Sequence, residues 1–240
     1  DEWVIYGTKL YITNGLQADW LCLLVRTSDE GGHRGMTQIV VPTATEGCSV
    51  SRKLDKLGQR SSDTAELSFV DARVPVDHTI GEIGRGFPQQ MAQFQNERLI
   101  AAYMAVGALE QALERTASYL RQRQAFGAPL LANDYIRYTM AELAAELEMV
   151  RSYTRSCARA VVEGADRMTV TKMASVAKLA TGRLQRRMAD TCMQFHGGIG
   201  YMEETWTARY FRDSRLLSIG GGADEVMLRI IAQLEGWTDL

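Results

Sequence analysis

Several features are scarce in this sequence, and each absence excludes a class of protein. No apolar run in the 240 residues approaches the length of a membrane-spanning helix. The formal net charge is only −2, so the chain lacks the basic footprint of a nucleic-acid-binding domain. The three histidines, His33, His78 and His196, never fall at metal-ligand spacing. A membrane span, a nucleic-acid site and a metal site are therefore not expected.

Cysteine is also sparse. Cys22, Cys48, Cys157 and Cys192 are widely separated and form no CxxC pair, which is typical of isolated thiols in a reducing compartment. A hydrophobic content of 46% and a charged content of 23% are those of an ordinary globular protein. The chain opens directly in strand-like sequence, "DEWVIYGTKLYITNG", so we expect it to be the later part of a longer protein.

The first 80 residues have the pattern of a β-domain. Short runs rich in β-branched and aromatic residues are separated by turn signals, among them Asn14-Gly15 and Glu30-Gly31-Gly32. The stretch "DARVPVD" predicts an exit strand and linker. The predicted strands cover residues 3–6, 10–13, 21–25, 38–41 and 66–70.

After Gly81 the apolar period changes from two to 3.6, which predicts helices. A first long helix begins near Pro88, and its mostly apolar face contains Met91, Phe94, Arg98 and Ala101. Long helices with short connections favour an antiparallel four-helix-type bundle over residues 81–240, giving an α+β protein with a domain boundary near residue 80. The further predicted helices cover residues 134–162, 169–195 and 206–212, with a last one starting near 224.

One carboxylate lies close to an apolar face. Glu97, in "NERLIAAYMAVG", follows Phe94 by three residues and precedes Ala101 by four, so it lies beside the apolar stripe. One interpretation is a rim glutamate that pairs with a basic neighbour. The other is a general base desolvated by apolar neighbours. The helical pattern alone favours the first.

Three further stretches each allow two interpretations. Arg121 and Arg123 in "LRQRQAFGAPL" suit a helix C-terminus on dipole grounds, whatever else they do. The glycines of "QFHGGIGY" permit close backbone approach, or only a helix cap and turn. The stretch "GGGADEV" offers free N–H groups ahead of a helix, either for an anion or for an Asp-capped helix start.

Taken in order, these motifs resemble those of the acyl-CoA dehydrogenase family. "GTKLYITNG" and "KLGQRSSDTAELSFVDARVP" resemble the family's middle β-domain, and "RQRQAFGAPL", "QFHGGIGYMEE" and "RYFRDSRLLSIGGGADEVM" resemble its C-terminal helical motifs. The resemblance covers all 240 residues. It implies that the family's N-terminal helical domain and the first strands of its β-domain are absent from this chain.

The resemblance implies FAD as cofactor, bound between the subunits of a homotetramer built as a dimer of dimers. Asn133 and Asp134 match a further FAD-contact position, where Asp134 replaces the family's usual Gln. Ala223 stands where a threonine hydroxyl is usual, so that contact is expected to be lost. The implied FAD-binding residues are Tyr11, Ile12, Thr13, Arg123, Gln124, Ala125, Phe126, Gln194, Gly197, Gly198 and Glu225.

The resemblance also implies where the catalytic base lies. Many family members carry a glutamate in the loop before the last helix, and here that position is Gly221. The alternative arrangement, similar to isovaleryl-CoA, long-chain and citronellyl-CoA dehydrogenases, puts the base on the first long helix, at Glu97. The Gly221 N–H would still polarise the thioester carbonyl. The implied substrate contacts are Gln95, Asn96, Arg98, Gly221 and Gly222.

The resemblance implies α,β-dehydrogenation of an acyl-CoA, of long or branched chain, to the trans-2-enoyl-CoA in fatty acid β-oxidation. Electron-transfer flavoprotein is the implied electron acceptor. The implied location is the cytoplasm of a bacterium or the mitochondrial matrix of a eukaryote. Two alternatives stay open: a flavin oxidase or monooxygenase on the same fold, and a non-catalytic scaffold.

Overall fold

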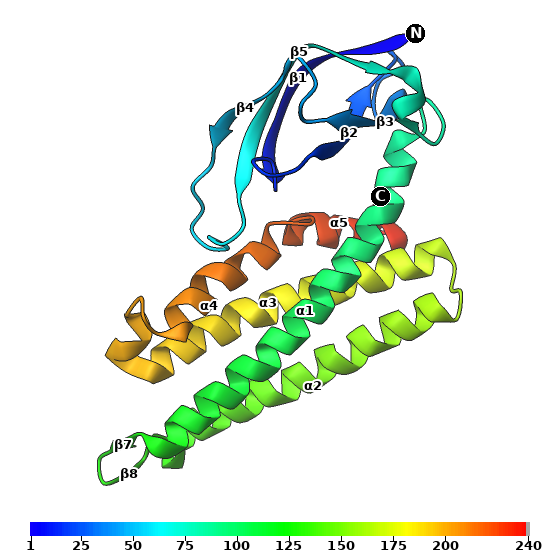
Figure 1. The fold of residues 1–240 in the computed structure, drawn as a ribbon. Helices are drawn as coiled ribbons and strands as arrows, with labels where there is room; N and C mark the ends of the chain where they lie inside the picture. Colours follow the sequence, from blue (N-terminus) through cyan, green and yellow to red (C-terminus); the bar gives the residue numbers. More distant parts are fainter. Residues whose placement is uncertain (239–240) are drawn as a thin grey trace. The chain divides into compact units, whose positions relative to one another are not determined.

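The structure is a computed structural model that describes residues 1–238, and it divides into two compact units (Figure 1). The first unit is the β part, from Asp1 to Gln93, and the second is the helical part, from Phe94 onward. The division falls inside the first long helix. The domain boundary near residue 80 stays a prediction.

The β unit contains two three-stranded antiparallel sheets. One sheet has the order β1-β5-β4 and the other the order β2-β3-β6. Alternating side chains of these strands form one apolar core that includes Ile39, Val41, Leu67 and Phe69. The strands are β1 (Glu2–Thr13), β2 (Trp20–Arg26), β3 (Met36–Pro42), β4 (Cys48–Lys53), β5 (Thr64–Pro75) and β6 (Thr79–Ile80).

Four strand predictions need correction. The predicted strands 3–6 and 10–13 are one strand, β1, whose register shifts at Gly7 and again between Lys9 and Ile12. Likewise 66–70 and the exit stretch form the single strand β5. The strand β4 was not predicted because its residues are mostly exposed and polar, and the two-residue β6 is too short to show a period.

In the part of the chain that the structure describes, the helical unit has three long helices and two shorter ones, and its connections include 3₁₀ turns and one small hairpin (Figure 1). The helix predictions agree with the structure to within a few residues at each end. The helices are α1 (Gly86–Gln122), α2 (Asp134–Val162), α3 (Arg167–His196), α4 (Trp206–Ser214) and α5 (Asp224–Leu234), and the hairpin strands are β7 (Gln124–Ala125) and β8 (Ala128–Pro129).

Local sequence sets the starts of α2 and α3. The Asn133 side chain accepts a hydrogen bond from Tyr135 N–H at 3.0 Å, and Asp166 accepts one from Met168 N–H at 2.9 Å. Both are N-caps, which satisfy main-chain donors that the helix leaves unpaired. The same contacts give Asn133 a structural role in capping α2.

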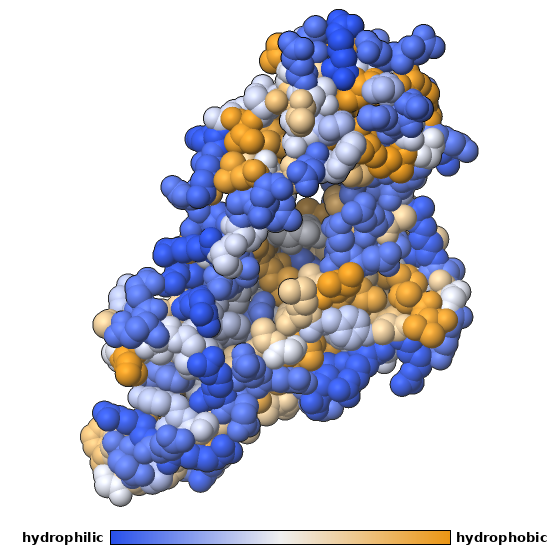
Figure 2. Space-filling model, in the orientation of Figure 1, coloured by the Kyte–Doolittle hydropathy of each residue, from blue (hydrophilic) through white to orange (hydrophobic). Residues whose placement is uncertain are grey.

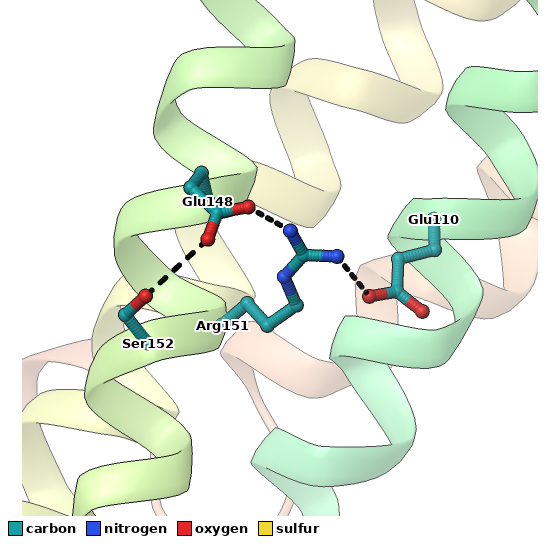
Figure 3. A network of polar contacts seen from close by, with 4 residues as sticks. All are labelled: Glu110, Glu148, Arg151 and Ser152. Atoms are coloured by element: carbon teal, nitrogen blue, oxygen red, sulfur yellow. Dashed lines mark hydrogen bonds and ion pairs between the residues drawn. The ribbon is translucent and has the colours of Figure 1, made fainter.

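The long helices pack through interleaved apolar side chains. Leu109 of α1, Leu143 of α2 and Met188 of α3 are almost fully buried members of one cluster. On the rim, Arg151 of α2 donates to Glu110 of α1 at 3.1 Å and also binds Glu148 of its own helix (Figure 3). The ion pairs lie at the surface, so we attribute most of the packing free energy to the apolar cluster. None of the helices described here has the length and apolar character to cross a membrane.

Candidate active site

The loop between the 3₁₀ turn Arg215–Ser218 and α5, which we call the glycine loop (residues 219–223), has an unusual backbone. Gly221 has φ +65° and Gly222 has φ +103°, both in the region that favours glycine. A Cβ on Gly221 would meet nothing within 4 Å, whereas one on Gly222 would lie 2.6 Å from Met227 Cε. Position 221 therefore faces open space and position 222 packs against α5.

Two buried cations hold this loop from the interior of the helical unit. The Arg98 Nε–H of α1 donates to the Gly221 carbonyl oxygen at 3.4 Å, and the Lys178 ammonium of α3 donates to the Gly222 carbonyl oxygen. Arg98 is 7% exposed and Lys178 is fully buried. Burial lowers the pKa of both groups, and the charge of Glu97 opposes that shift at Arg98. The loop is thus tied to two different helices.

The first turn of α5 adds a negative charge. Asp224 is 5% exposed, and its Oδ2 lies 3.5 Å from Arg186 Nη1 and 3.9 Å from Arg183 Nε. Its Oδ1 has no hydrogen-bond partner among the described residues. Among the described residues, the N–H groups of residues 221–223 donate no hydrogen bond to a main-chain or side-chain acceptor. These donors at a helix N-terminus suit an anion or a developing oxyanion.

The Glu97 side chain is exposed. This agrees with a rim glutamate, the interpretation that the helical pattern alone favours, and not with a base that its own unit desolvates. The buried stripe of α1 passes through Arg98 and Ala102, so Glu97 lies about 100° away from it around the helix. Its own face carries the exposed apolar side chains Ile100 and Met104, at 58% and 73% exposure. The carboxylate is therefore flanked by apolar surface that other groups of this unit leave uncovered.

The other residues implied to contact substrate lie on the same first turns of α1. The Gln95 side chain bonds Thr171 of α3, which gives it a structural partner inside the unit. Asn96 is exposed. The space-filling view shows apolar side chains at the surface of the helical unit, among polar ones (Figure 2). Of the predicted substrate residues, the structure joins Arg98 to the glycine loop through its bond to Gly221, and Glu97 is next to Arg98 in the chain.

At the far end of α1 is a second group of predicted residues. Arg98 and Gln122 lie roughly 36 Å apart along the helix, given a rise of about 1.5 Å per residue. The hairpin β7–β8 follows, and its turn residues Phe126 and Gly127 both have positive φ, +54° and +81°. Phe126 is completely exposed. A strained, exposed aromatic residue does not stabilise this unit, so its place is explained better by a contact outside it.

The end of α3 lies beside the end of α1. His196 stacks on Tyr119 of α1 with ring centroids 4.2 Å apart, and Tyr119 Oη–H donates to the His196 carbonyl oxygen at 3.3 Å. Burial lowers the pKa of His196, whose Nδ1 bonds the Cys192 carbonyl oxygen at 2.7 Å. A hollow of about 360 Å³ lies here, lined by residues that include Arg115 and Trp206.

The predicted cofactor residues at this end are exposed, except for the half-buried Ala125. Gln194 lies just before the buried His196 and Gly197 and Gly198 just after it, and Gly197 has φ +63°. Arg123 is exposed and forms no ion pair within residues 1–238. The structure thus brings the Arg123–Phe126 and Gln194–Gly198 segments to one end of the helical unit. We call these two segments together the hairpin end.

The remaining predicted cofactor residues lie elsewhere. In the β unit, Tyr11 has φ +63° at a bulge of β1 and is 74% exposed, with Ile12 and Thr13 following it. Bulges of this kind redirect a side chain and are common beside binding sites. Glu225 is exposed in the first turn of α5, and Asp134 pairs with Arg137.

Sequence reasoning missed Lys178 and the environment of Asp224. The available signal for Lys178 was its spacing, because it follows Ala174 by four residues and precedes Thr181 by three on the buried face of α3. A lysine on an otherwise apolar or small-residue stripe is a candidate for a partnered buried charge.

Comparisons with known proteins agree with this architecture. The family description "Acyl-CoA dehydrogenase, middle domain" matches residues 1–72, and "Acyl-CoA dehydrogenase, C-terminal domain" matches residues 84–234. The crystal structure of a probable acyl-CoA dehydrogenase from Mycobacterium abscessus superposes with a TM-score of 0.93 at 40% identity, covering 97% of this chain and 61% of that one.

Curated relatives give the same result over nearly the whole chain. The mitochondrial short-chain specific acyl-CoA dehydrogenase of Bos taurus is 35% identical over 232 residues, and the long-chain specific enzyme of Mus musculus is 34% identical over 234 residues. The alignments cover 97% of this chain but only 56% and 54% of those relatives, so the chain spans about half their length. The chain belongs to the acyl-CoA dehydrogenase family.

Proposed function

We propose that the protein is an FAD-dependent acyl-CoA dehydrogenase that removes hydrogens from the α and β carbons of an acyl-CoA thioester, with Glu97 as the base. The observation that carries this proposal is the connection between α1 and the glycine loop. Arg98 bonds the Gly221 carbonyl oxygen, and Glu97 is the residue immediately before Arg98. Glu97 is therefore next in the chain to the residue that binds this loop, whose own position 221 has no side chain.

The exposed segments fit a flavin. Phe126 and Arg123 at the hairpin end and Tyr11 in the β unit are exposed, and strained backbone presents both aromatic residues. Gln194, Gly197 and Gly198 add polar and main-chain groups at the hairpin end, where a neighbouring subunit's FAD would be held. When bound, FAD accepts the β-hydrogen as a hydride.

The chain's own groups would perform the proton chemistry. An α-proton of a thioester is weakly acidic, and donors aimed at the carbonyl oxygen stabilise the enolate that forms as it leaves. The unpaired N–H groups of the glycine loop supply such donors. Glu97 would take the α-proton, and the neighbouring Ile100 and Met104 would exclude water once the acyl chain covers them.

The conformation of Gly221 supports a base that has moved away from the loop. At φ +65° a side chain is strained by about 1–2 kcal/mol, so the loop as shaped favours glycine. The space beside it is open, which leaves room for a substituent near the β-carbon. We therefore favour a long or branched acyl chain over a short straight one.

The partners follow from the same surfaces. The exposed hairpin end and exposed apolar side chains of α2, such as Val162, suit a homotetramer in which subunits share flavin sites. The proposed electron acceptor is an electron-transfer flavoprotein.

The intact protein, purified with FAD, tests this function when it is mixed anaerobically with straight and branched acyl-CoAs. Loss of the flavin's visible absorption with one class, and its slow return in air, is the expected result. Rapid reoxidation with peroxide formation would show an oxidase. Retention of the flavin colour with every thioester would contradict the enzyme proposal and favour a scaffold.

A further inference from the structure

The glycine loop needs external restraint to work as a donor site. It contains Gly220, Gly221 and Gly222 in succession, and glycine loses more conformational freedom on ordering than any other residue. Donors that stabilise a transition state are effective only when they are already oriented. The loop's main-chain bonds are those that Ile219 and Gly220 donate to Leu216 and the one that Ala223 accepts from Met227, so residues 221 and 222 require partners elsewhere.

Lys178 supplies one of those partners. It is a fully buried cation in the middle of α3, and its ammonium donates to the Gly222 carbonyl oxygen. A hydrogen bond from a charged donor is about twice as strong as a neutral one, and its strength increases in a dry interior. Arg98 holds the preceding carbonyl from α1.

Peptide geometry makes these contacts relevant to the donors. In a trans peptide, the carbonyl and the N–H of the next residue point in opposite directions, and residues 1–238 contain no cis peptide. Holding the Gly222 carbonyl inward therefore turns the Ala223 N–H outward. Holding the Gly221 carbonyl turns the Gly222 N–H outward in the same way. The two peptides that follow Gly221 are thus fixed by two buried cations.

We infer that Lys178 is a positioning residue. By fixing the peptide between Gly222 and Ala223, it keeps the glycine loop in the one conformation that aims its N–H groups, including that of the adjacent Gly221, at the thioester carbonyl of the substrate. This inference rests on the proposed function. Lys178 does not touch the substrate and exchanges no proton with it, because its side chain is fully buried. Asp224 near the same helix end raises the pKa of Lys178 against the effect of burial, which favours the cation that the contact needs.

The test compares two neutral substitutions of similar size, Lys178→Met and Lys178→Gln, in the intact FAD-bound protein. Lys172→Met, at a partly exposed position of the same helix, is the matched control. The first readout is the rate of anaerobic flavin bleaching. The second is the carbonyl stretching frequency of a bound trans-2-enoyl-CoA labelled with ¹³C at the thioester carbonyl, which reports polarisation without any turnover.

In K178M the bleaching rate is expected to fall about 10- to 100-fold with KM changed by less than about threefold, and the carbonyl frequency to return toward its value in water. K178Q keeps a donor and should recover much of both. Wild-type rate and wild-type carbonyl frequency in K178M would overturn the inference.

If K178M does not fold, K178Q decides the question. A carbonyl frequency close to wild type, with a rate within about tenfold, supports positioning through the hydrogen bond. A large loss of rate with an unchanged carbonyl frequency would overturn it. The absence of bleaching by any thioester in wild type is a separate result, which refutes the proposed function instead.

Discussion

The groups near the two ends of α1 differ in whether contacts within the helical unit hold them in place. At the start of the helix, the glycine loop has almost no side chains of its own and is held by the buried cations Arg98 and Lys178. At the other end, the two-residue turn of the β7–β8 hairpin sets the positive φ of Phe126, but no contact within the described chain explains why a fully exposed aromatic residue occupies that turn.

The difference indicates which site one chain can organise alone. The loop that would bind the thioester carbonyl has its restraints within a single helical unit. The side chains of the hairpin end point outward, so they can bind only a molecule that lies outside this unit. Substitutions at the first end should therefore change chemistry, and those at the second should change cofactor retention and assembly.

The largest effect is expected for Glu97→Gln, which keeps the size of the side chain and removes the proposed base. Loss of a positioned base typically lowers a rate about 10²- to 10⁴-fold, so anaerobic bleaching should slow by that factor while FAD content stays the same. Glu114→Gln, an exposed glutamate of the same helix, is the control. Loss of FAD from E97Q would contradict the assignment of chemistry to the first end of α1 and of cofactor retention to the second.

The second-largest effect is expected for Phe126→Ala at the hairpin end. A well-placed interface aromatic contributes about 2 kcal/mol or more, so FAD affinity should fall at least about 30-fold. The melting temperature of the separated subunit should not fall, because Phe126 packs against nothing in its own chain. Equilibrium FAD binding and sedimentation measure the two properties. Val70→Ala, at an exposed site of the β unit, should leave both unchanged.

A smaller, pH-dependent effect is expected at His196, which supports the hairpin end from inside. Its pKa is lowered by burial, so below pH 6.5 the unfolded chain binds a proton that the folded chain does not. The free energy of unfolding should therefore fall as the pH decreases from about 6.5. His196→Gln should remove part of that slope and cost about 1 kcal/mol through lost stacking on Tyr119. Urea titrations from pH 5 to 8 measure both, and an unchanged slope would contradict the assignment.

The smallest effect is expected midway along α1, at the exposed ion-pair network in Figure 3. Arg151→Met removes the contacts to Glu110 and Glu148. Surface pairs contribute about 0–1 kcal/mol, so the free energy of unfolding should change by less than about 1 kcal/mol and the flavin chemistry not at all. A larger loss would mean that the network, and not the apolar cluster, holds α1 to α2.

Local sequence signals predicted much of the fold but less of the site. The 3.6-residue period predicted each of the five helices found within residues 1–238, because each buries one apolar face. β1 was split in two because the bulges at Gly7 and before Ile12 interrupt its alternation. The contact between Lys178 and Gly222 joins residues that are 44 positions apart, and no local pattern encodes such a contact. The exposure of Glu97 also depends on which helices cover α1.

The most direct test of the central claim, that the base lies on α1 and not in the glycine loop, isolates proton removal from hydride transfer. It uses an acyl-CoA in which sulfur replaces the β-carbon, so that the α-proton can leave but no β-hydride can. Exchange of the α-hydrogen with deuterium oxide is followed by NMR in the presence of the FAD-bound protein. We expect wild type to catalyse exchange and E97Q to do so at least about 100-fold more slowly with unchanged binding. Exchange by E97Q at the wild-type rate would contradict the account.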